Sequence, residues 1–321
     1  MGTTPCLFSC ARPGKPAIKK VRGFLSLPGE LRNQIYRYYF EFEYRCEVAA
    51  KGSNFEAYKP RTIKLWAGAF QPDAQSLKYQ LRLNNDDLRT IRISRSLGKY
   101  NIVQGLQTNW FNSLFALSLV CKQTYTETVP FLYKKTTFVF DAPNRITNFL
   151  NVVSNPKLEY ITKLELHYAT YGSPSWNKDR IWQEKHARSW TRALKDLSKK
   201  LVGLQELKIW ICVNDYSPRF NLRESWVSPL LQFRRLVTTT PRRKALEAVK
   251  IVLRTRVSHW SFEGNQALVK ASAALHRLFG QAISSAVLGA KEDEAIAAFE
   301  EAWNGKYAMW QYHLGFGKTE W

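Results

Sequence analysis

The first long amphipathic pattern in the chain begins at Pro28. Its apolar residues recur every three or four positions, the spacing of one face of an α-helix. They are Leu27, Leu31, Ile35, Tyr38 and Phe42. Pro28 suits the first position of a helix, because its fixed φ and missing N–H cost nothing there. Glu30 places a carboxylate near the positive end of the helix. The pattern predicts a helix with one apolar stripe.

A second stripe with the same spacing lies between Leu114 and Phe140. Its members are Leu114, Leu117, Cys121, Tyr125, Val129 and Leu132. An apolar stripe on a helix needs a partner that shields it from water. We therefore expect the two helices to pack against each other.

The residues of these two blocks carry a resemblance to a known family. The runs LSLPGELRNQIY and ALSLVCKQTYTETVPFLYKKTTF resemble the F-box-like proteins abundant in filamentous fungi, over Phe24–Phe42 and Leu114–Phe140. An ordinary F-box is continuous, whereas residues Glu43–Trp110 separate the two halves here. The resemblance implies a helical unit that docks on the Skp adaptor subunit of a Skp–cullin–F-box ubiquitin ligase, with a C-terminal region that binds the client.

The resemblance also implies which residues face the Skp adaptor. They are Leu25, Leu27, Pro28, Glu30, Leu31, Ile35, Leu117, Val120 and Cys121. The alternative is that both helices belong to the core. Solvent exposure distinguishes the adaptor interpretation from the core interpretation, since an adaptor surface leaves part of the stripe open as an apolar patch.

The segment between the two blocks has short runs of alternating apolar and polar residues, separated by turn residues, which indicates strands. The runs are Glu43–Ala50, Thr62–Phe70, Tyr79–Asn84 and Thr90–Ser96. Leu81 and Leu83 could pair with Ile91 and Ile93 across an Asn-Asn-Asp-Asp turn. We expect a small inserted antiparallel sheet within residues 43–110 that braces the helices.

Further along, three similar segments recur with anchors at Leu164, Leu207 and Val249, at spacings of 43 and 42 residues. The segments are Ile161–Tyr168, Leu204–Ile211 and Leu246–Leu253. Helical patterns separate them, with apolar positions at Trp190, Leu194, Leu197 and Leu201, and at Leu230, Phe233 and Val237 after Ser228-Pro229. Alternating strands and helices predict parallel strands joined by right-handed crossovers. The period favours an irregular layer like that of leucine-rich-repeat proteins.

The expected fold class is α+β or α/β, in four segments. Residues 1–23 form a flexible basic arm, 24–140 the F-box-like helical unit with its β insertion, and 141–263 the layer of parallel strands and helices. Residues 264–321 form a helical C-terminal tail, whose acids in 291–305 could pack beside the basic residues described next.

The composition is strongly basic, with 48 Lys and Arg against 26 Asp and Glu, a net charge of +22. Such a charge attracts acidic partners or nucleic acid. A basic patch is expected at Arg234, Arg235, Arg242, Arg243, Lys244, Lys250, Arg254 and Arg256, with Trp260 and Phe262 nearby to stack on bases. Basic residues on an edge strand also prevent aggregation between sheets, so both interpretations stay open.

The client surface is expected in the loops after the three parallel strands, because such loops converge at one edge of a sheet. The client-binding residues expected there are Tyr168, Tyr171, Trp176, Asp215, Tyr216, Phe220, Arg256, His259 and Trp260. Three functions then compete: an F-box-like ubiquitin ligase adaptor, a basic nucleic-acid-binding protein, and an interaction module without a ligase partner.

No catalytic or metal-binding motif stands out in the sequence. The five cysteines form no CxxC pair, and the five histidines do not cluster with cysteines or carboxylates. Cys121 and Cys212 are expected to be core thiols. We expect no enzyme activity, no cofactor, no metal and no membrane span, and an intracellular protein in the cytoplasm or nucleus.

Overall fold

The computed structural model of the chain describes residues 23–41, 43–48, 62–64, 89–93, 117–174, 177–215, 218–238, 246–256, 262, 265–314 and 316. Of residues 62–64 and 89–93 it describes the backbone alone. The chain divides into two compact units, which comprise residues 1–39 and 40–321. The basic arm expected at 1–23 lies, except for Gly23, outside the described residues.

The first unit contains the helix that was predicted to follow Pro28. A short 3-10 helix, η1 (Phe24–Ser26), precedes α1 (Gly29–Tyr39). The carbonyl oxygen of Pro28 accepts a hydrogen bond from the N–H of Arg32 at 3.1 Å, so Pro28 immediately precedes the helix, one residue earlier than the first helical position predicted for it. The predicted helix is confirmed, although it ends before Phe42.

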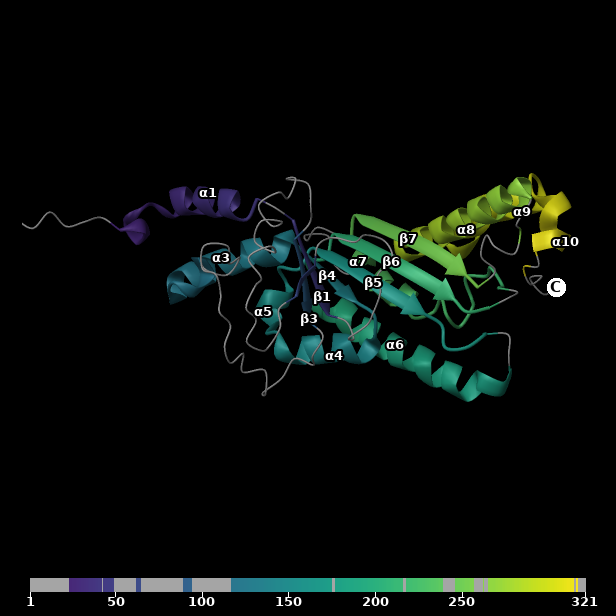
Figure 1. Cartoon of the computed structure of the whole chain (residues 1–321), viewed down its shortest axis with the longest axis horizontal. Helices are drawn as coiled ribbons and strands as arrows, with labels where there is room; N and C mark the ends of the chain where they lie inside the picture. The colour runs from purple at the N-terminus through teal and green to yellow at the C-terminus, as the bar shows by residue number, and fades with distance from the viewer. Residues whose placement is uncertain are drawn as a thin grey trace, which may run out of the picture. The chain divides into compact units, whose positions relative to one another are not determined.

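The second unit is built on one parallel sheet with the strand order β2-β3-β1-β4-β5-β6-β7. Figure 1 shows β4, β5, β6 and β7 side by side in this sheet. Its described strands are β1 (Tyr44–Val48), β2 (Thr62–Lys64), β3 (Arg89–Ile93), β4 (Thr136–Phe140), β5 (Lys163–Ala169), β6 (Glu206–Val213) and β7 (Ala248–Thr255). Every neighbouring pair is parallel. Strands from the segments predicted at 24–140 and 141–263 therefore belong to a single sheet.

For the strands of the insertion that the structure describes, the predicted antiparallel arrangement is wrong. Strand β1 pairs in parallel with both β3 and β4, and β2 pairs in parallel with β3, so these strands extend the main sheet. Alternating residues identify a strand but carry no information on the direction of its neighbour. The segment Tyr79–Asn84, and with it the expected pairing of Leu81 and Leu83, lies outside the described residues.

The three segments with a period of 42 to 43 residues do lie side by side. Leu164 on β5 pairs with Leu207 on β6, and Leu207 pairs with Val249 on β7. The predicted parallel arrangement of these strands is confirmed (Figure 1). The comparison with leucine-rich repeats stays a prediction.

Helical segments connect these strands, as the alternation predicted. The helices α4 (Pro143–Val152) and α5 (Asn155–Leu158) follow β4, and α6 (Arg180–Lys200) follows β5. Between β6 and β7 the predicted α-helix after Ser228-Pro229 is mostly the 3-10 helix η5 (Leu230–Arg234), continued by the short α7 (Arg235–Thr238).

The second predicted stripe is not one continuous helix. The 3-10 helix η3 (Leu117–Leu119) is followed by α3 (Lys122–Lys135), and Cys121 caps the latter. The thiol of Cys121 accepts a hydrogen bond from the N–H of Thr124, and the Thr124 hydroxyl accepts one from the N–H of Cys121. This reciprocal cap begins a new helix at Lys122, so the helical pattern is interrupted at Cys121 and resumes with Tyr125, Val129 and Leu132 in α3. The packing of this stripe against that of α1 stays a prediction.

The C-terminal segment is helical, as predicted. It contains α8 (Gln266–Val287), α9 (Glu292–Asn304), the 3-10 helix η7 (Ala308–Trp310) and α10 (Gln311–Leu314). Helix α8 packs closely on β7, since a Cβ added at Gly280 would lie 3.1 Å from the carbonyl oxygen of Ile251. The segment is therefore part of the main body rather than a separate tail.

One face of the sheet carries the core. Neighbouring helical segments α4, α6, η5 and α8 contact one another in sequence and form a layer. Buried residues of this layer, such as Trp190, Phe233 and Phe279, join one core cluster with Leu164 and Leu207 of the strands. Because side chains alternate along a strand, the residues between these apolar ones point to the opposite face.

Candidate functional site

The opposite face of β5, β6 and β7 is polar, and we call it the polar sheet face. It consists of Lys163, Glu165, His167, Glu206, Lys208, Trp210, Cys212, Ala248, Lys250, Val252 and Arg254. Every member on β6 and β7 is exposed or half-buried. Strands of parallel sheets are normally buried on both faces. An accessible polar face on three parallel strands is therefore a candidate binding surface.

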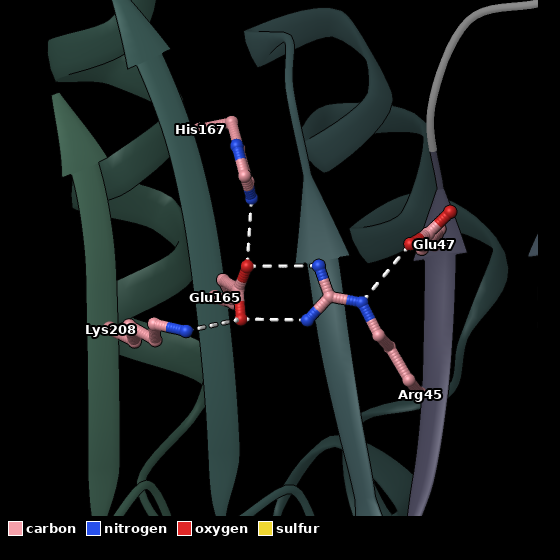
Figure 2. A network of polar contacts seen from close by, with 5 residues as sticks. All are labelled: Arg45, Glu47, Glu165, His167 and Lys208. Atoms are coloured by element: carbon pink, nitrogen blue, oxygen red, sulfur yellow. Dashed lines mark hydrogen bonds and ion pairs between the residues drawn. The ribbon is translucent and has the colours of Figure 1, made fainter. Parts of the chain in front are cut away.

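A network built around the buried charges of Arg45, Glu47 and Glu165 joins one side of this surface to β1 (Figure 2). Arg45 on β1 donates two hydrogen bonds to the Glu165 carboxylate, from Nη1 at 2.7 Å and from Nη2 at 2.9 Å. Its Nε donates to Glu47 at 3.0 Å. The other contacts of Glu165 are to His167 Nε2 at 2.8 Å and to Lys208 Nζ at 3.5 Å. The network thus ties β1 to β5 and β6.

Electrostatics keep Glu165 ionised within this network. Burial alone would raise its pKa, but the hydrogen bonds from His167 and Arg45 and the charge of Lys208 outweigh burial and hold the pKa far below its usual range. Burial disfavours the charged form of Arg45, and the two carboxylates that it contacts raise its pKa above the ordinary value. Arg45 and Lys208 together balance the charges of Glu47 and Glu165.

Trp210 lies at the centre of the polar sheet face. The ring of His167, on the neighbouring β5, stacks on the indole with centroids 5.9 Å apart and an interplanar angle of 15°. Lys208 Nζ lies 4.7 Å from the ring centroid, and the guanidinium carbon of Arg254, on the neighbouring β7, lies 5.7 Å from it. Cation–π contacts of this kind hold the indole in place. Among the described residues, its buried Nε1 has no hydrogen-bond partner.

The outer part of the face is cationic. Lys208 and Lys250 are directly opposite each other in the β6–β7 pairing, and Lys250 and Arg254 are both exposed. Like charges directly opposite each other across strands are destabilising. Lys208 has Glu165 as its counter-ion, whereas the exposed acid of the face, Glu206, contacts Lys163 at 3.6 Å. An anion placed above Lys250 and Lys208 would relieve their repulsion.

The predicted basic patch is not a single surface. Lys250 and Arg254 belong to the polar sheet face, whereas Arg234 ends η5 on the helical side and donates from Nη2 to the carbonyl oxygen of Gly289. Arg235 follows on the same side, and Arg256 is exposed just beyond β7. Arg242, Arg243, Lys244 and Trp260 lie outside the described residues, and Phe262 is buried. These basic residues lie close together in the sequence, so the sequence did not show that they belong to two different faces.

The acidic helix α9 does not neutralise the polar sheet face through its first turn. Glu292 contacts Arg223 at 2.8 Å, and Arg223 is not among the residues predicted to form the patch. Glu292 also lines one pocket together with Arg234, so the acidic helix lies beside this member of the predicted patch, on the helical side.

The loops after β5 and β6 do meet, as predicted. The N–H of Asn214 donates to the Thr170 hydroxyl at 2.9 Å, and the Ser173 hydroxyl donates to Asp215 at the same distance. Three of the predicted client contacts, however, are buried, namely Tyr168, Asp215 and Phe220. Tyr168 packs on Trp190 and Phe220 on Phe279, so they stabilise the core rather than face a client. Trp176, Tyr216, His259 and Trp260 lie outside the described residues.

Tyr171 is exposed, and two residues that the sequence reasoning missed are exposed near it. Ile181 and Trp182 lie in the first turn of α6, which Gln183 ties to the β5 loop by a hydrogen bond to the carbonyl oxygen of Ser173. We call Tyr171, Ile181 and Trp182 the apolar end patch. In the sequence, this patch was indicated by two adjacent large apolar residues, Ile181 and Trp182, that precede the buried stripe that includes Trp190.

The residues implied to face the Skp adaptor are largely accessible. In the first unit Leu25, Leu31 and Ile35 have exposed fractions of 44%, 47% and 40%. Pro28 and Glu30 are also exposed, and Leu27 is half-buried. In the second unit Val120 is 70% exposed, with the exposed Leu119 beside it, and Leu117 and Cys121 are half-buried. Most of these side chains are therefore accessible rather than buried in a core of their own unit.

The thiols differ from the prediction of core cysteines. Cys212 is exposed on the polar sheet face, and Cys121 is a half-buried helix cap whose pKa is lowered by hydrogen bonds with Thr124. Within the described ranges, no three His, Cys, Asp or Glu side chains are grouped as metal ligands. The described helices include none with the length and apolarity needed to cross a bilayer.

Comparison with known proteins gives one match. A family model described as a domain of unknown function, DUF7730, matches residues 20–249. This match spans most of both units, from the segment before α1 to the second residue of β7. No curated protein and no solved structure matches the chain.

Proposed function

We propose that this chain, which belongs to the family of the domain of unknown function DUF7730, is a protein-interaction adaptor. Its first unit binds a Skp-type adaptor subunit, and its second unit binds a client protein. On this proposal the chain is a substrate-recognition subunit of a Skp–cullin–F-box ubiquitin ligase.

The observation that carries the proposal is the exposure of the apolar side chains on η1 and α1. Leu25, Leu31 and Ile35 each leave 40% or more of their surface in water. Burying a leucine or isoleucine side chain fully is worth roughly 1.5–3 kcal/mol. Several apolar side chains left open on one short helix favour a protein partner over a purely structural role.

The second unit contributes exposed apolar residues of its own. Leu119 and Val120 are exposed at η3, in the segment that resembles the second half of an F-box. At the carboxyl ends of the strands, the apolar end patch offers a separate surface of the composition found in protein interfaces. These surfaces support an adaptor that holds more than one partner.

The test is a binding assay between the full chain and a purified Skp-type adaptor. The double variant Leu31→Asp, Ile35→Asp places two carboxylates where the proposed interface is apolar. Each substitution removes part of the transfer energy and adds a charge that must be desolvated. We expect affinity to fall by roughly 100-fold or more, equivalent to about 2.7 kcal/mol.

The matched control is Asn33→Asp, Gln34→Asp, which adds the same charge at exposed polar positions of the same helix. The control should bind like the wild type. Equal binding by the wild type and the Leu31, Ile35 variant would refute the ligase part of the proposal. It would leave an interaction module without a ligase partner, which is the competing function.

A further inference from the structure

One face of helix α6 carries a row of basic side chains. Its members recur every three or four positions, so they lie on one side of the helix. We call this row the basic stripe, and it consists of Lys185, Arg188, Arg192, Lys195 and Lys199. All of them are exposed, on the side of the helix opposite the buried Trp190, Leu194 and Leu197. At 1.5 Å per residue the stripe extends about 21 Å.

The apolar end patch continues the basic stripe towards the start of α6. Ile181 precedes Lys185 by four residues and therefore occupies the next position of the same row. Lys185 Nζ lies 4.5 Å from the centroid of the Trp182 ring, a cation–π contact that joins the stripe to the patch. Ile181 and Trp182 are 68% and 57% exposed. An apolar surface and a cationic surface are thus contiguous on one helix.

We propose that this combined surface binds a client segment in which large apolar residues lie next to a run of acidic residues. The apolar residues of the segment contact the apolar end patch, and its carboxylates contact the basic stripe. The inference rests on the proposed function, because it assigns the client to a surface of the second unit and gives the chemical class of the client segment.

Charge complementarity selects an acidic partner. Helix α6 has seven Lys and Arg residues against two acids, Glu184 and Asp196. Glu184 contacts Arg180 at 3.4 Å and Arg188 at 3.1 Å. Within the described ranges, three members of the stripe form no ion pair, namely Arg192, Lys195 and Lys199. Like charges three or four residues apart on a helix repel each other. Carboxylates of a partner would remove this repulsion as well as add an attraction.

The composition of the surface favours a protein segment over nucleic acid. Tryptophan, tyrosine and arginine are enriched at protein interfaces. Bases stack on open aromatic faces, whereas Lys185 lies over one face of the Trp182 ring and Ile181 has no ring at all. Tight nucleic-acid binding typically uses about six to ten phosphate contacts. The stripe has five cations, of which Arg188 already contacts Glu184.

The experiment measures fluorescence anisotropy with the full chain and labelled probes. The anchored acidic probe is a peptide that begins with Leu-Phe and continues with about eight residues that alternate Glu with Ser. These residues extend about 26 Å, which covers the length of the stripe. Each further probe changes one property. In one peptide Gln replaces Glu, in another Ser replaces Leu and Phe, and a single-stranded oligouridylate of equal charge tests nucleic acid.

The charge variant is Arg192→Glu, Lys195→Glu. Its matched control is Lys270→Glu, Arg277→Glu, which also reverses one exposed arginine and one exposed lysine, on helix α8. We expect the wild type to bind the anchored acidic probe more tightly than its Gln counterpart, and less tightly as salt is added. The charge variant should lose affinity for the acidic probe by about 10-fold or more, while the control stays within about twofold.

The anchor variant is Trp182→Ala. Its matched control is Tyr312→Ala, which removes another exposed aromatic ring, on α10. The anchor variant should bind the anchored acidic probe about 10-fold more weakly than the wild type, because an aromatic side chain at the centre of an interface contributes strongly to affinity. It should bind the probe with Ser in place of Leu and Phe as the wild type does, and the control should bind both probes unchanged.

Several results would overturn the inference. They are no binding of the acidic probe by the wild type, equal losses in the charge variant and its control, and unchanged binding of the anchored probe by the anchor variant. Preferential binding of the oligouridylate would overturn it in favour of nucleic acid.

The variant Leu31→Asp, Ile35→Asp separates this inference from the proposed function. Its substitutions lie in the first unit, so it should bind the acidic probe like the wild type. Loss of Skp-adaptor binding with retained peptide binding is the expected combination. Failure of the adaptor assay alone refutes the ligase part of the proposed function, and failure of the peptide assay alone refutes the inference.

Discussion

Replacing Glu165 with glutamine tests the buried network beside the polar sheet face. The substitution keeps the shape of the side chain but removes the charge that faces Arg45 Nη1 at 2.7 Å and Nη2 at 2.9 Å. The side chains of Arg45 and Glu165 have exposed fractions of only 8% and 3%. Within the network, the remaining carboxylate in contact with Arg45 would then be that of Glu47, at 3.0 Å. Glu165→Gln should therefore destabilise the second unit.

The magnitude follows from the cost of an unbalanced buried charge. Removing one partner of a buried ion pair typically costs about 3–5 kcal/mol. Glu47 remains to offset part of the Arg45 charge, so we expect a loss of about 2–4 kcal/mol in the free energy of unfolding. Glu206→Gln is the matched control, because Glu206 is an exposed partner of Lys163 at 3.6 Å. An exposed pair of this kind is worth at most about 1 kcal/mol.

Urea unfolding followed by circular dichroism measures both variants, and the pH dependence adds an independent check. The pKa of Glu165 is lowered in the folded protein from an ordinary value of 4.5. Its ionised form therefore stabilises the fold fully above about pH 4.5, and this contribution is lost as pH falls towards the folded pKa. The difference between wild type and Glu165→Gln should stay constant from about pH 7 to pH 5 and shrink below about pH 4.5.

Two results would refute this reasoning. One is a cost for Glu165→Gln that equals the cost of Glu206→Gln, which would mean that the network does not stabilise the sheet. The other is a difference between wild type and variant that grows as the solution becomes more acidic, which would give Glu165 a raised pKa.

Two further predictions concern packing and thiol chemistry. A Cβ added at Gly203 would lie 2.1 Å from the carbonyl oxygen of Glu159. Gly203→Ala should therefore lower the free energy of unfolding by about 2–3 kcal/mol, measured by urea titration. An unchanged midpoint of unfolding would contradict this close contact. Desolvation and the charge of Glu47 raise the pKa of the half-buried Cys46 to about 12, which keeps its thiol protonated at neutral pH. Brief alkylation near neutral pH, read by mass spectrometry, should therefore modify Cys121 and Cys212 and spare Cys46 until urea is added, and equal rates for Cys46 and Cys212 would contradict the raised pKa.

The sequence predicted the parts of the fold that depend on local pattern or on repetition. The stripe that includes Trp190 and Leu194 predicted α6, and the spacing of Leu164, Leu207 and Val249 predicted three parallel strands in their observed register. These signals are strong because one buried helix face and one repeated anchor leave a regular trace along the chain.

Pairing between strands that are distant in the sequence produces no such regular pattern along the chain. The strand at Tyr44–Val48 was expected, but its parallel neighbours β3 and β4 were not, because alternation has no direction. The buried network was missed for the same reason. Arg45 and Glu165 are 120 residues apart, and a charged residue on a strand ordinarily indicates a solvated face.

The candidate site was predicted least well where a loop was assumed to be a surface. Tyr168, Asp215 and Phe220 were assigned to the client but are buried, because residues near strand ends also close the core and fasten neighbouring loops. Lys250 and Arg254 were correctly expected to face away from Ile251 and Leu253 along β7. The alternation of residues along β7 predicted which face of the strand they lie on, and the structure was needed to show that this face is accessible.

The central claim is that the exposed apolar residues of α1 bind a Skp-type adaptor, while a separate surface binds the client. The most direct measurement is quantitative mass spectrometry of proteins purified with the full chain after nuclease treatment, comparing wild type, Leu31→Asp/Ile35→Asp and the control Asn33→Asp/Gln34→Asp. The account predicts that the first variant loses the Skp-type adaptor and keeps the remaining partners, while the control keeps all of them. Identical partner sets for all three proteins would contradict it.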